Sequence, residues 1–117
     1  MTWIYHQMNG HIYHNHYFVG TGYSGFGPGL NNPHYEGADH IGVIPHGRYR
    51  IKPIAERKLG GDDVMMLTSV LPNKQINFDC FIRGDNSMHN GAQAIILDQK
   101  IRKEIAASRD YALQVIQ

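Results

Sequence analysis

The stretch of sequence that decides the fold is residues 78–97, which read FDCFIRGDNSMHNGAQAIIL. Phe78, Cys80 and Ile82 fall on one face of an alternating run, and this pattern predicts a strand with one buried face. A polar loop containing glycine follows, and the apolar run 94–97 predicts a second buried strand. Because the two strands would fix the polar side chains while leaving them reachable, we expect a binding or catalytic site in this loop.

The N-terminal residues predict a β-hairpin. Residues 2–8 and 11–19 are rich in aromatic and β-branched side chains and flank Asn9-Gly10, a dipeptide that favours the positive φ of hairpin turns. On the second strand His14 and His16 would share a face, as metal ligands do. No Cys, Asp or Glu lies nearby to complete a site, so we interpret them as surface histidines and predict no metal and no other cofactor.

The remaining chain predicts more strands and one helix. Alternation of apolar and polar residues predicts strands over 48–54, 64–70 and 111–116. Asp98 can accept hydrogen bonds from the first N–H groups of a helix that follows it. The apolar stripe of this helix comprises Leu97, Ile101 and Ile105. Residues 1–117 therefore predict a single, mainly β domain with one α-helix in the C-terminal region.

Composition narrows the classes of function. The chain has 117 residues, a formal net charge of +1 and one cysteine. A net charge this close to zero shows no excess of basic residues of the kind that binds nucleic acid. A single cysteine excludes an internal disulfide. No apolar run approaches the ~20 residues of a membrane span, and no leader pattern opens the sequence. We expect synthesis in the cytoplasm, no membrane insertion and no nucleic-acid partner.

Residues 20–33 are rich in glycine and include two prolines. Such a segment cannot be regular throughout, and its length is typical of a loop that wraps a site. Two interpretations stay open at this point. The loop lines a substrate cleft, or it covers the edge of a sheet.

Several short motifs occur in a recognisable order. They are YSGFG at 23–27 followed by NNP at 31–33, GVIPHGRY at 42–49, RGD at 83–85 and GAQAI at 91–95. In this order, across nearly the whole chain, they resemble the motifs of the L,D-transpeptidase-like effectors delivered by type VI secretion. Those effectors are distant relatives of the YkuD-type L,D-transpeptidases.

The resemblance implies an L,D-transpeptidase-like β-sandwich and a cleft that binds the stem peptide of peptidoglycan. Family members carry His-Gly-Asp and then Ser-x-Gly-Cys-Ile, in which the Cys is the nucleophile and the His its base. In this chain the His position is Arg83, the Ser position is Gly91 and the Cys position is Ala94. The implied substrate-binding residues are Tyr23, Ser24, Gly25, Arg83, Gly84 and Asp85.

Other residues offer alternative chemistry. Cys80 is three positions from Arg83 on the strand, so if Arg83 faces the cleft, Cys80 faces the core. The remaining hydroxyl candidates are Ser24 and Ser87, and the candidate bases are His46 and His89.

Arg83 also has two interpretations. Its guanidinium could bind a ligand carboxylate, or it could form a structural ion pair with Asp85 or Asp79.

These observations leave three functional hypotheses. The first is a catalytically degenerate L,D-transpeptidase-like domain that binds stem peptide or a protein partner, such as an immunity protein or a secretion component, without turnover. The second is an active peptidoglycan L,D-transpeptidase or L,D-carboxypeptidase, an antibacterial toxin with an unaligned nucleophile. The third is a structural or interaction domain. In the first two cases a secretion system would deliver the protein to the periplasm of a target cell.

Overall fold

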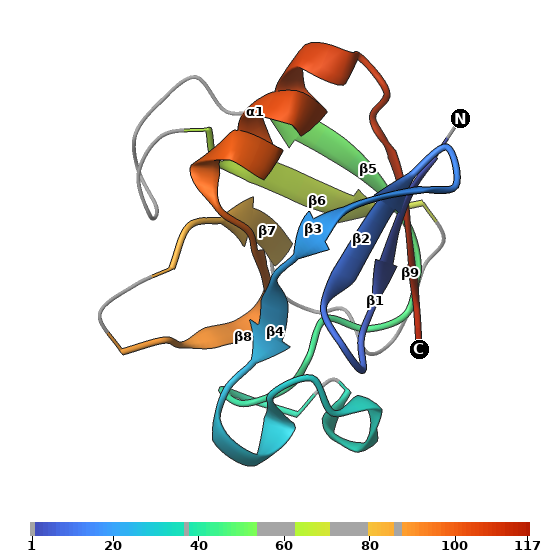
Figure 1. The fold of residues 1–117 in the computed structure, drawn as a ribbon. Coiled ribbons are helices and arrows are strands. Elements are labelled where there is room, and N and C mark those ends of the chain that lie inside the picture. The colour runs from blue at the N-terminus through green and yellow to red at the C-terminus, as the bar shows by residue number, and fades with distance from the viewer. Residues whose placement is uncertain (1, 37, 54–62, 71–79, 86–87) are drawn as a thin grey trace.

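The structure, a computed structural model, describes residues 2–36, 38–53, 63–70, 80–85 and 88–117. It is mainly β, with one α-helix near the C-terminus, which confirms the predicted fold class (Figure 1). The strands are β1 (Trp3–His6), β2 (His11–His14), β3 (Tyr17–Thr21), β4 (Tyr23–Gly25), β5 (Gly47–Pro53), β6 (Met65–Ser69), β7 (Cys80–Arg83), β8 (Gly91–Ile96) and β9 (Ala112–Ile116). The helical elements are α1 (Gln99–Ser108) and the 3-10 turns η1 (Gly27–Gly29) and η2 (Pro33–Tyr35).

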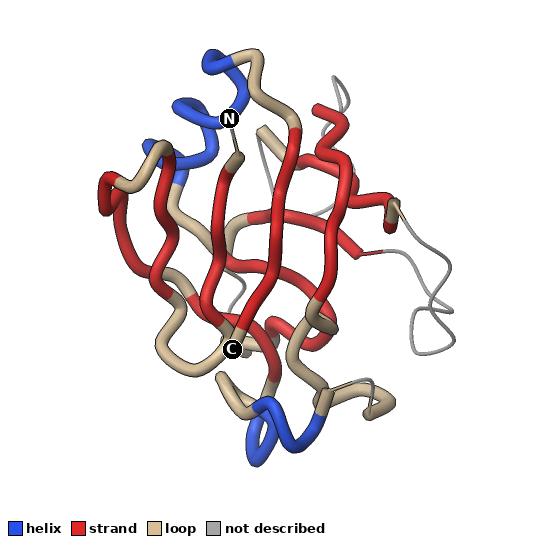
Figure 2. Tube along the Cα trace, turned by 90° about the vertical axis from the view of Figure 1, so that its right-hand side faces the viewer, coloured by secondary structure: helices blue, strands red, loops and turns tan. Residues whose placement is uncertain are grey.

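The described strands belong to one nine-stranded sheet, in the order β3-β2-β1-β9-β5-β6-β7-β8-β4. Its two edge strands, β3 and β4, follow each other in the chain with only Gly22 between them. The sheet therefore curls until its edges nearly meet, as Figure 2 shows. Two neighbouring pairs are parallel, β1 with β9 and β7 with β8, and the others are antiparallel. A division into the two stacked sheets of a sandwich stays a prediction.

Alternation along the strands places the core inside this curled sheet. On β5 the side chains of Tyr49 and Ile51 are buried, while Arg48 and Arg50 are exposed on the outer face. The strand predicted over 48–54 is thereby confirmed as far as Pro53, where the described part of that segment ends.

Helix α1 covers one end of the sheet, because its sequence caps it and gives it one apolar face. The Asp98 carboxylate accepts a hydrogen bond from the Ile101 N–H at 2.9 Å, which confirms the predicted N-cap. Leu97, Ile101 and Ile105 are buried, as the stripe predicts. The Ile101 side chain lies so close to Gly20 of β3 that a Cβ there would approach its Cδ1 to 2.5 Å, so Gly20 lets the helix approach the sheet.

The N-terminal hairpin is confirmed, but the prediction of one continuous strand over 11–19 is wrong. β1 and β2 pair antiparallel, with four residues between His6 and His11. The second strand stops at His14, because Asn15 and His16 have φ of 52° and 71° and turn the chain into β3. Positive φ at both central residues is the signature of a type I′ hairpin turn.

This turn also changes the interpretation of the two histidines. His16 lies in the turn, and therefore does not share a strand face with His14. Instead His14 stacks on the ring of Trp3, with centroids 3.9 Å apart, and its Nε2 lies 2.8 Å from Asp110 Oδ2. Among the described residues no group of three His, Cys, Asp or Glu side chains is placed to hold a metal ion. Within the same residues, no helix is long and apolar enough to cross a membrane.

Candidate functional site

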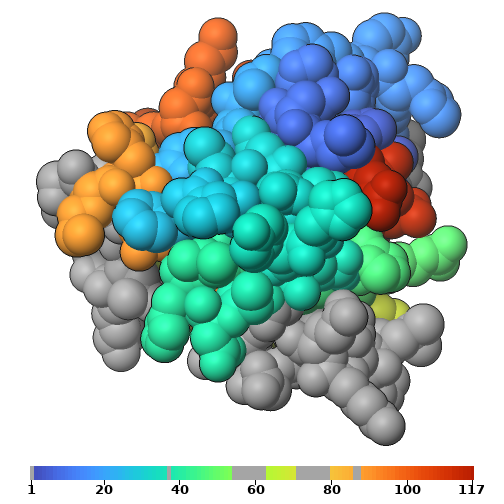
Figure 3. Space-filling model, turned by 90° about the horizontal axis from the view of Figure 1, so that it is seen from below, coloured from blue at the N-terminus to red at the C-terminus, as the bar shows by residue number. Residues whose placement is uncertain are grey.

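The frame of the site consists of β4, β7 and β8 at one end of the sheet order. β7 and β8 are parallel, with Arg83 opposite Ile96, and β4 runs antiparallel along the outer side of β8. Residues 23–25 of the glycine-rich segment therefore form an edge strand beside the loop that leaves β7. Figure 3 shows the segments drawn in cyan and in orange as neighbours on the lower face of the molecule.

Three polar side chains meet at this place. The Tyr23 hydroxyl donates a short hydrogen bond to Asp85 Oδ1, and Nδ1 of His89 lies 2.6 Å from Asp85 Oδ2. The His89 side chain is 76% exposed and that of Asp85 41%. We name Tyr23, Asp85 and His89 the Tyr-Asp-His cluster. Asp85 orients both partners, one through each carboxylate oxygen.

Tyr23 is protonated at neutral pH, as an ordinary tyrosine is, and the electrostatics of the cluster favour this form further. Partial burial, and then the hydrogen bond and negative charge of Asp85, raise the pKa of Tyr23 well above its usual value, while the nearby Arg83 cation acts in the opposite direction. Tyr23 is thus a hydrogen-bond donor here rather than a base or nucleophile.

Arg83 fastens the loop between β7 and β8. Its Nη2 donates to the carbonyl of Asn90 at 2.6 Å and its Nη1 to the carbonyl of Gly84 at 3.2 Å. The guanidinium therefore links both ends of the loop through main-chain oxygens. Among the described residues its partners are these carbonyls and not the Asp85 carboxylate; the alternative ion pair with Asp79 lies outside the described residues.

The other two positions that the resemblance aligns with reactive residues, Ala94 and Gly91, hold no reactive group. Ala94, at the nucleophile position, ends in a methyl group and is 4% exposed. Gly91, at the serine position, lies against the ring of Tyr23: a Cβ built on Gly91 would come within 2.8 Å of Tyr23 Cε2 and of Ile96 Cγ1. A serine there would require both side chains to move.

The remaining predicted residues serve the scaffold. Cys80 is buried in the core at 1% exposure, as predicted from its strand position. Ser24 is fully buried, and its hydroxyl accepts a hydrogen bond from the Ile44 N–H at 2.8 Å. Gly25 has φ of 92° and a Cβ there would lie 2.2 Å from the Gly29 carbonyl oxygen, so it makes a close backbone contact. Gly84 is buried at the start of the loop. Ser87 lies outside the described residues.

Of the predicted substrate-binding residues, the structure thus brings Tyr23, Arg83 and Asp85 together at the surface. Ser24, Gly25 and Gly84 are buried beneath or beside them. His89, considered only as a possible base, proves to be part of the cluster.

A third carboxylate-histidine pair, besides Asp110–His14 and Asp85–His89, was missed by sequence reasoning. His46 Nδ1 lies 2.6 Å from Glu36 Oε1, and the same oxygen accepts a hydrogen bond from the His46 main-chain N–H at 2.7 Å. Both residues lie in irregular segments ten positions apart, a spacing that carries no structural signal. The Asp85–His89 pair, four positions apart, could not be assigned either, because eight histidines offer many such spacings.

The chemistry available to the cluster follows from the geometry of His89. With Nδ1 facing a carboxylate, the neutral form of the imidazole carries its proton on Nδ1 and has Nε2 as an acceptor. This is the arrangement of a general base oriented by an acid. Among the described residues, however, no hydroxyl or thiol is hydrogen-bonded to His89 as a nucleophile would be.

A scan against protein-family models, a search of curated proteins and a search of solved structures each found no match to this chain.

Proposed function

We propose that this protein is a catalytically degenerate L,D-transpeptidase-like domain that binds a peptidoglycan stem peptide without turning it over. The observation that carries the proposal is the state of the nucleophile position: Ala94 ends in a buried methyl group. Acyl transfer by the family route needs a thiolate with a base in hydrogen-bond reach, and Ala94 supplies no thiol.

The other positions agree with a cleft that no longer performs this reaction. Cys80, the chain's single thiol, is 1% exposed in the core. Arg83, at the base position, is held by two main-chain carbonyls and cannot accept a proton. Tyr23 fills the space above Gly91 that a serine would occupy.

The Tyr-Asp-His cluster supports binding of a zwitterionic peptide. Asp85 keeps 41% of its side chain exposed and offers lone pairs to a ligand ammonium group. His89, the most exposed member, can donate a hydrogen bond to a ligand carboxylate when it is protonated. A stem peptide carries both kinds of group. His89, rather than the already bonded Arg83, is therefore the group we assign to the carboxylate.

The alternative is an active L,D-carboxypeptidase or L,D-transpeptidase with a different nucleophile. The Asp85–His89 pair favours it, because a carboxylate-oriented imidazole can activate water or a substrate hydroxyl. The two functions differ in whether product forms.

One experiment separates them. The protein is titrated with purified tetrapeptide stem by calorimetry, and the same mixtures are analysed for product by mass spectrometry. We expect saturable binding without product, weakened about tenfold by Asp85→Asn or His89→Gln, as loss of a charge-assisted hydrogen bond predicts. His34→Gln, an exposed histidine outside the cluster, is the control and should bind like the native chain.

Release or exchange of D-alanine that disappears in His89→Gln would overturn the pseudoenzyme and establish the active enzyme. Absence of both binding and product would overturn both functions and leave a structural or interaction domain. Equal binding by the cluster variants and the native chain would place the ligand elsewhere on the molecule.

A further inference from the structure

A groove of about 700 Å³ opens on the outer face of β5 and β9, where α1 ends. Three arginines line it. Arg48 and Arg50 come from β5, and Arg109 is the residue that ends α1. Val70 and Tyr111, both partly exposed, supply apolar surface to the same groove.

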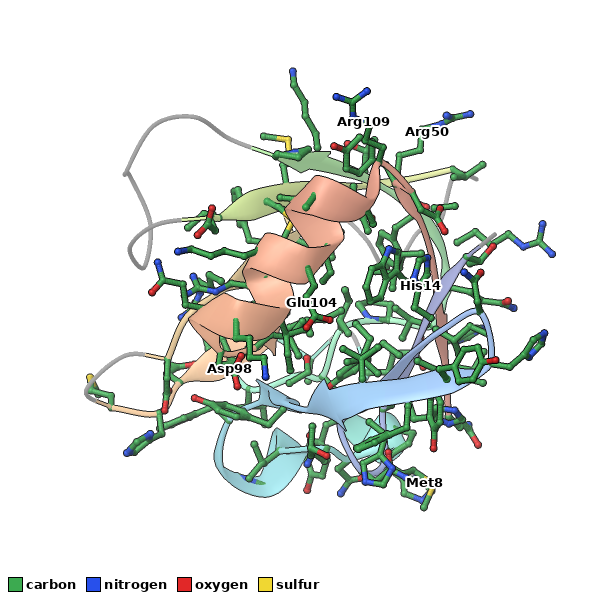
Figure 4. All side chains as sticks on the ribbon, turned by 45° about the horizontal axis from the view of Figure 1, so that its top comes forward. Met8, His14, Arg50, Asp98, Glu104 and Arg109 are labelled. Atoms are coloured by element: carbon green, nitrogen blue, oxygen red, sulfur yellow. The ribbon has the colours of Figure 1, made fainter. Side chains whose placement is uncertain are left out.

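The backbone brings the three guanidinium groups to one place. Arg48 and Arg50 are two apart on a strand, so both point to the outer face, about 7 Å apart along the strand. Arg50 pairs across the sheet with Ala112, three residues after Arg109. Arg109 has φ of 58°, and this left-handed turn leads the chain from α1 into β9. Figure 4 shows Arg50 and Arg109 near each other at the top of the molecule.

The charges in the groove are not neutralised within the described part of the chain. There, no hydrogen bond or ion pair joins the side chains of Arg48, Arg50 or Arg109 to another residue. The nearest acid in sequence, Asp110, also lines the groove, but its Oδ2 lies 2.8 Å from His14 Nε2 and its side chain is 13% exposed.

The C-terminal end of a helix carries partial negative charge, which would oppose an anion beside it. In α1 two of the last four carbonyls accept side-chain hydrogen bonds. The Ile105 carbonyl accepts from Ser108 Oγ at 2.6 Å, and the Ala106 carbonyl accepts from the Tyr111 hydroxyl at 3.0 Å. Tyr111 thereby contacts both the end of the helix and the groove. These two hydrogen bonds reduce the negative charge that the end of the helix presents to a groove lined by three arginines.

We propose that this groove binds a small ligand with two or more adjacent anionic groups, phosphate or carboxylate. Guanidinium groups present paired N–H donors that match both groups, and several in one groove favour a multiply charged anion over a single one. Gln114, opposite Arg48 on β9, adds an amide that can donate to the same ligand. Because the whole chain has a net charge of only +1, the positive charge of the groove is a local feature and not part of a basic surface. A local cluster of cations suits a compact anion better than a long polyanion.

The test is calorimetric titration of the full chain with tripolyphosphate and, in a parallel arm, with citrate, at physiological salt. We expect saturable binding of at least one, and the preferred probe identifies the anionic group. Arg50→Gln/Arg109→Gln should weaken binding by about tenfold or more, as loss of charge-assisted contacts predicts. Lys100→Gln/Lys103→Gln removes the same net charge from the exposed face of α1 and should change binding less than about threefold.

Equal weakening by the two double variants would show a response to net charge alone and overturn the proposal. So would binding of duplex DNA or anionic vesicles with both small anions inert. Circular dichroism of each variant establishes that it is folded. If Arg50→Gln/Arg109→Gln is not folded, Arg50→Lys/Arg109→Lys takes its place: it keeps the charge and loses the paired donors, and unchanged binding by it would overturn the assignment of guanidinium recognition.

Discussion

Replacing Tyr5 by Phe removes a hydroxyl that is buried without a hydrogen-bond partner among the described residues. Tyr5 is 0% exposed, so the hydroxyl is also cut off from solvent. A buried polar group left unpaired costs about 1–3 kcal/mol of stability, and the ring that makes the apolar contacts is unchanged by the substitution. We expect Tyr5→Phe to raise the free energy of unfolding by about 1 kcal/mol. For a domain of this size the melting temperature then rises by about 4 °C.

Tyr49→Phe is the matched control. Tyr49 is 1% exposed, but its hydroxyl donates to the Pro45 carbonyl at 2.7 Å. Removing that hydroxyl leaves the carbonyl unpaired, so this variant should lose about 1 kcal/mol. Urea denaturation followed by the fluorescence of Trp3, the single tryptophan, measures both free energies. The two variants should differ by about 2 kcal/mol, in opposite directions from the native chain.

Alkaline pH gives a second measurement of the same two tyrosines. Burial raises the pKa of Tyr5 above the ordinary phenol value. The pKa of Tyr49 is also raised, and burial is the largest cause. As the pH rises, the unfolded chain therefore loses these two protons before the folded chain does. The free energy of unfolding keeps its full value below about pH 10 and falls above it, by up to about 1.4 kcal/mol per pH unit for each tyrosine. Tyr5→Phe should make this alkaline decline shallower.

A loss of stability in Tyr5→Phe as large as that in Tyr49→Phe would refute the reasoning, because it would mean that the Tyr5 hydroxyl is hydrogen-bonded in solution. An alkaline decline as steep as that of the native chain would likewise contradict the burial of this phenol.

Three further predictions concern local geometry. Asp98→Ala should cost about 1 kcal/mol, measured by thermal denaturation, since it removes the N-cap acceptor of α1, and Asp98→Asn should retain most of that stability. His16→Gly should stabilise by about 1 kcal/mol, because His16 occupies the left-handed region in the turn between β2 and β3; a destabilised variant would contradict the type I′ assignment. Gly91→Ser should cost about 1–3 kcal/mol by crowding Tyr23 and Ile96, and a double-mutant cycle with Tyr23→Ala should recover part of it; strictly additive costs would exclude that contact.

The features that sequence analysis predicted correctly depend on residues that are close to one another in the sequence. Tyr49 and Ile51 alternate with arginines, and this pattern alone defines an inner and an outer face of β5. Asp98 followed by an apolar stripe is likewise a local pattern, and it predicts where α1 begins. The break at Asn15-His16 was missed because no glycine marks it; Asn and His adopt a positive φ more often than most residues, but the surrounding run of β-forming side chains was interpreted as continuous.

Pairing between distant strands could not be predicted from the sequence. Nothing in the alternation of β1 indicates that its parallel partner is β9, more than 100 residues later. The site depends on the same kind of information: Tyr23 meets Asp85 across 62 positions because β4 adds to the edge of β8. Motif spacing drew attention to the loop after Arg83. It could not show that Arg83 bonds to carbonyls or that Ser24 is buried.

The position of β9 has a consequence for how the protein is made on the ribosome. β9 lies between β1 and β5 and is the strand that pairs with both. Of the described strands it is also the last in sequence, so it is translated after the other eight. Until it emerges from the exit tunnel, β1 and β5 each present an unpaired edge, and such edges attract chaperones or other nascent chains. Premature termination just before Ala112 would thus release a polypeptide with two open edges rather than a slightly shorter native protein.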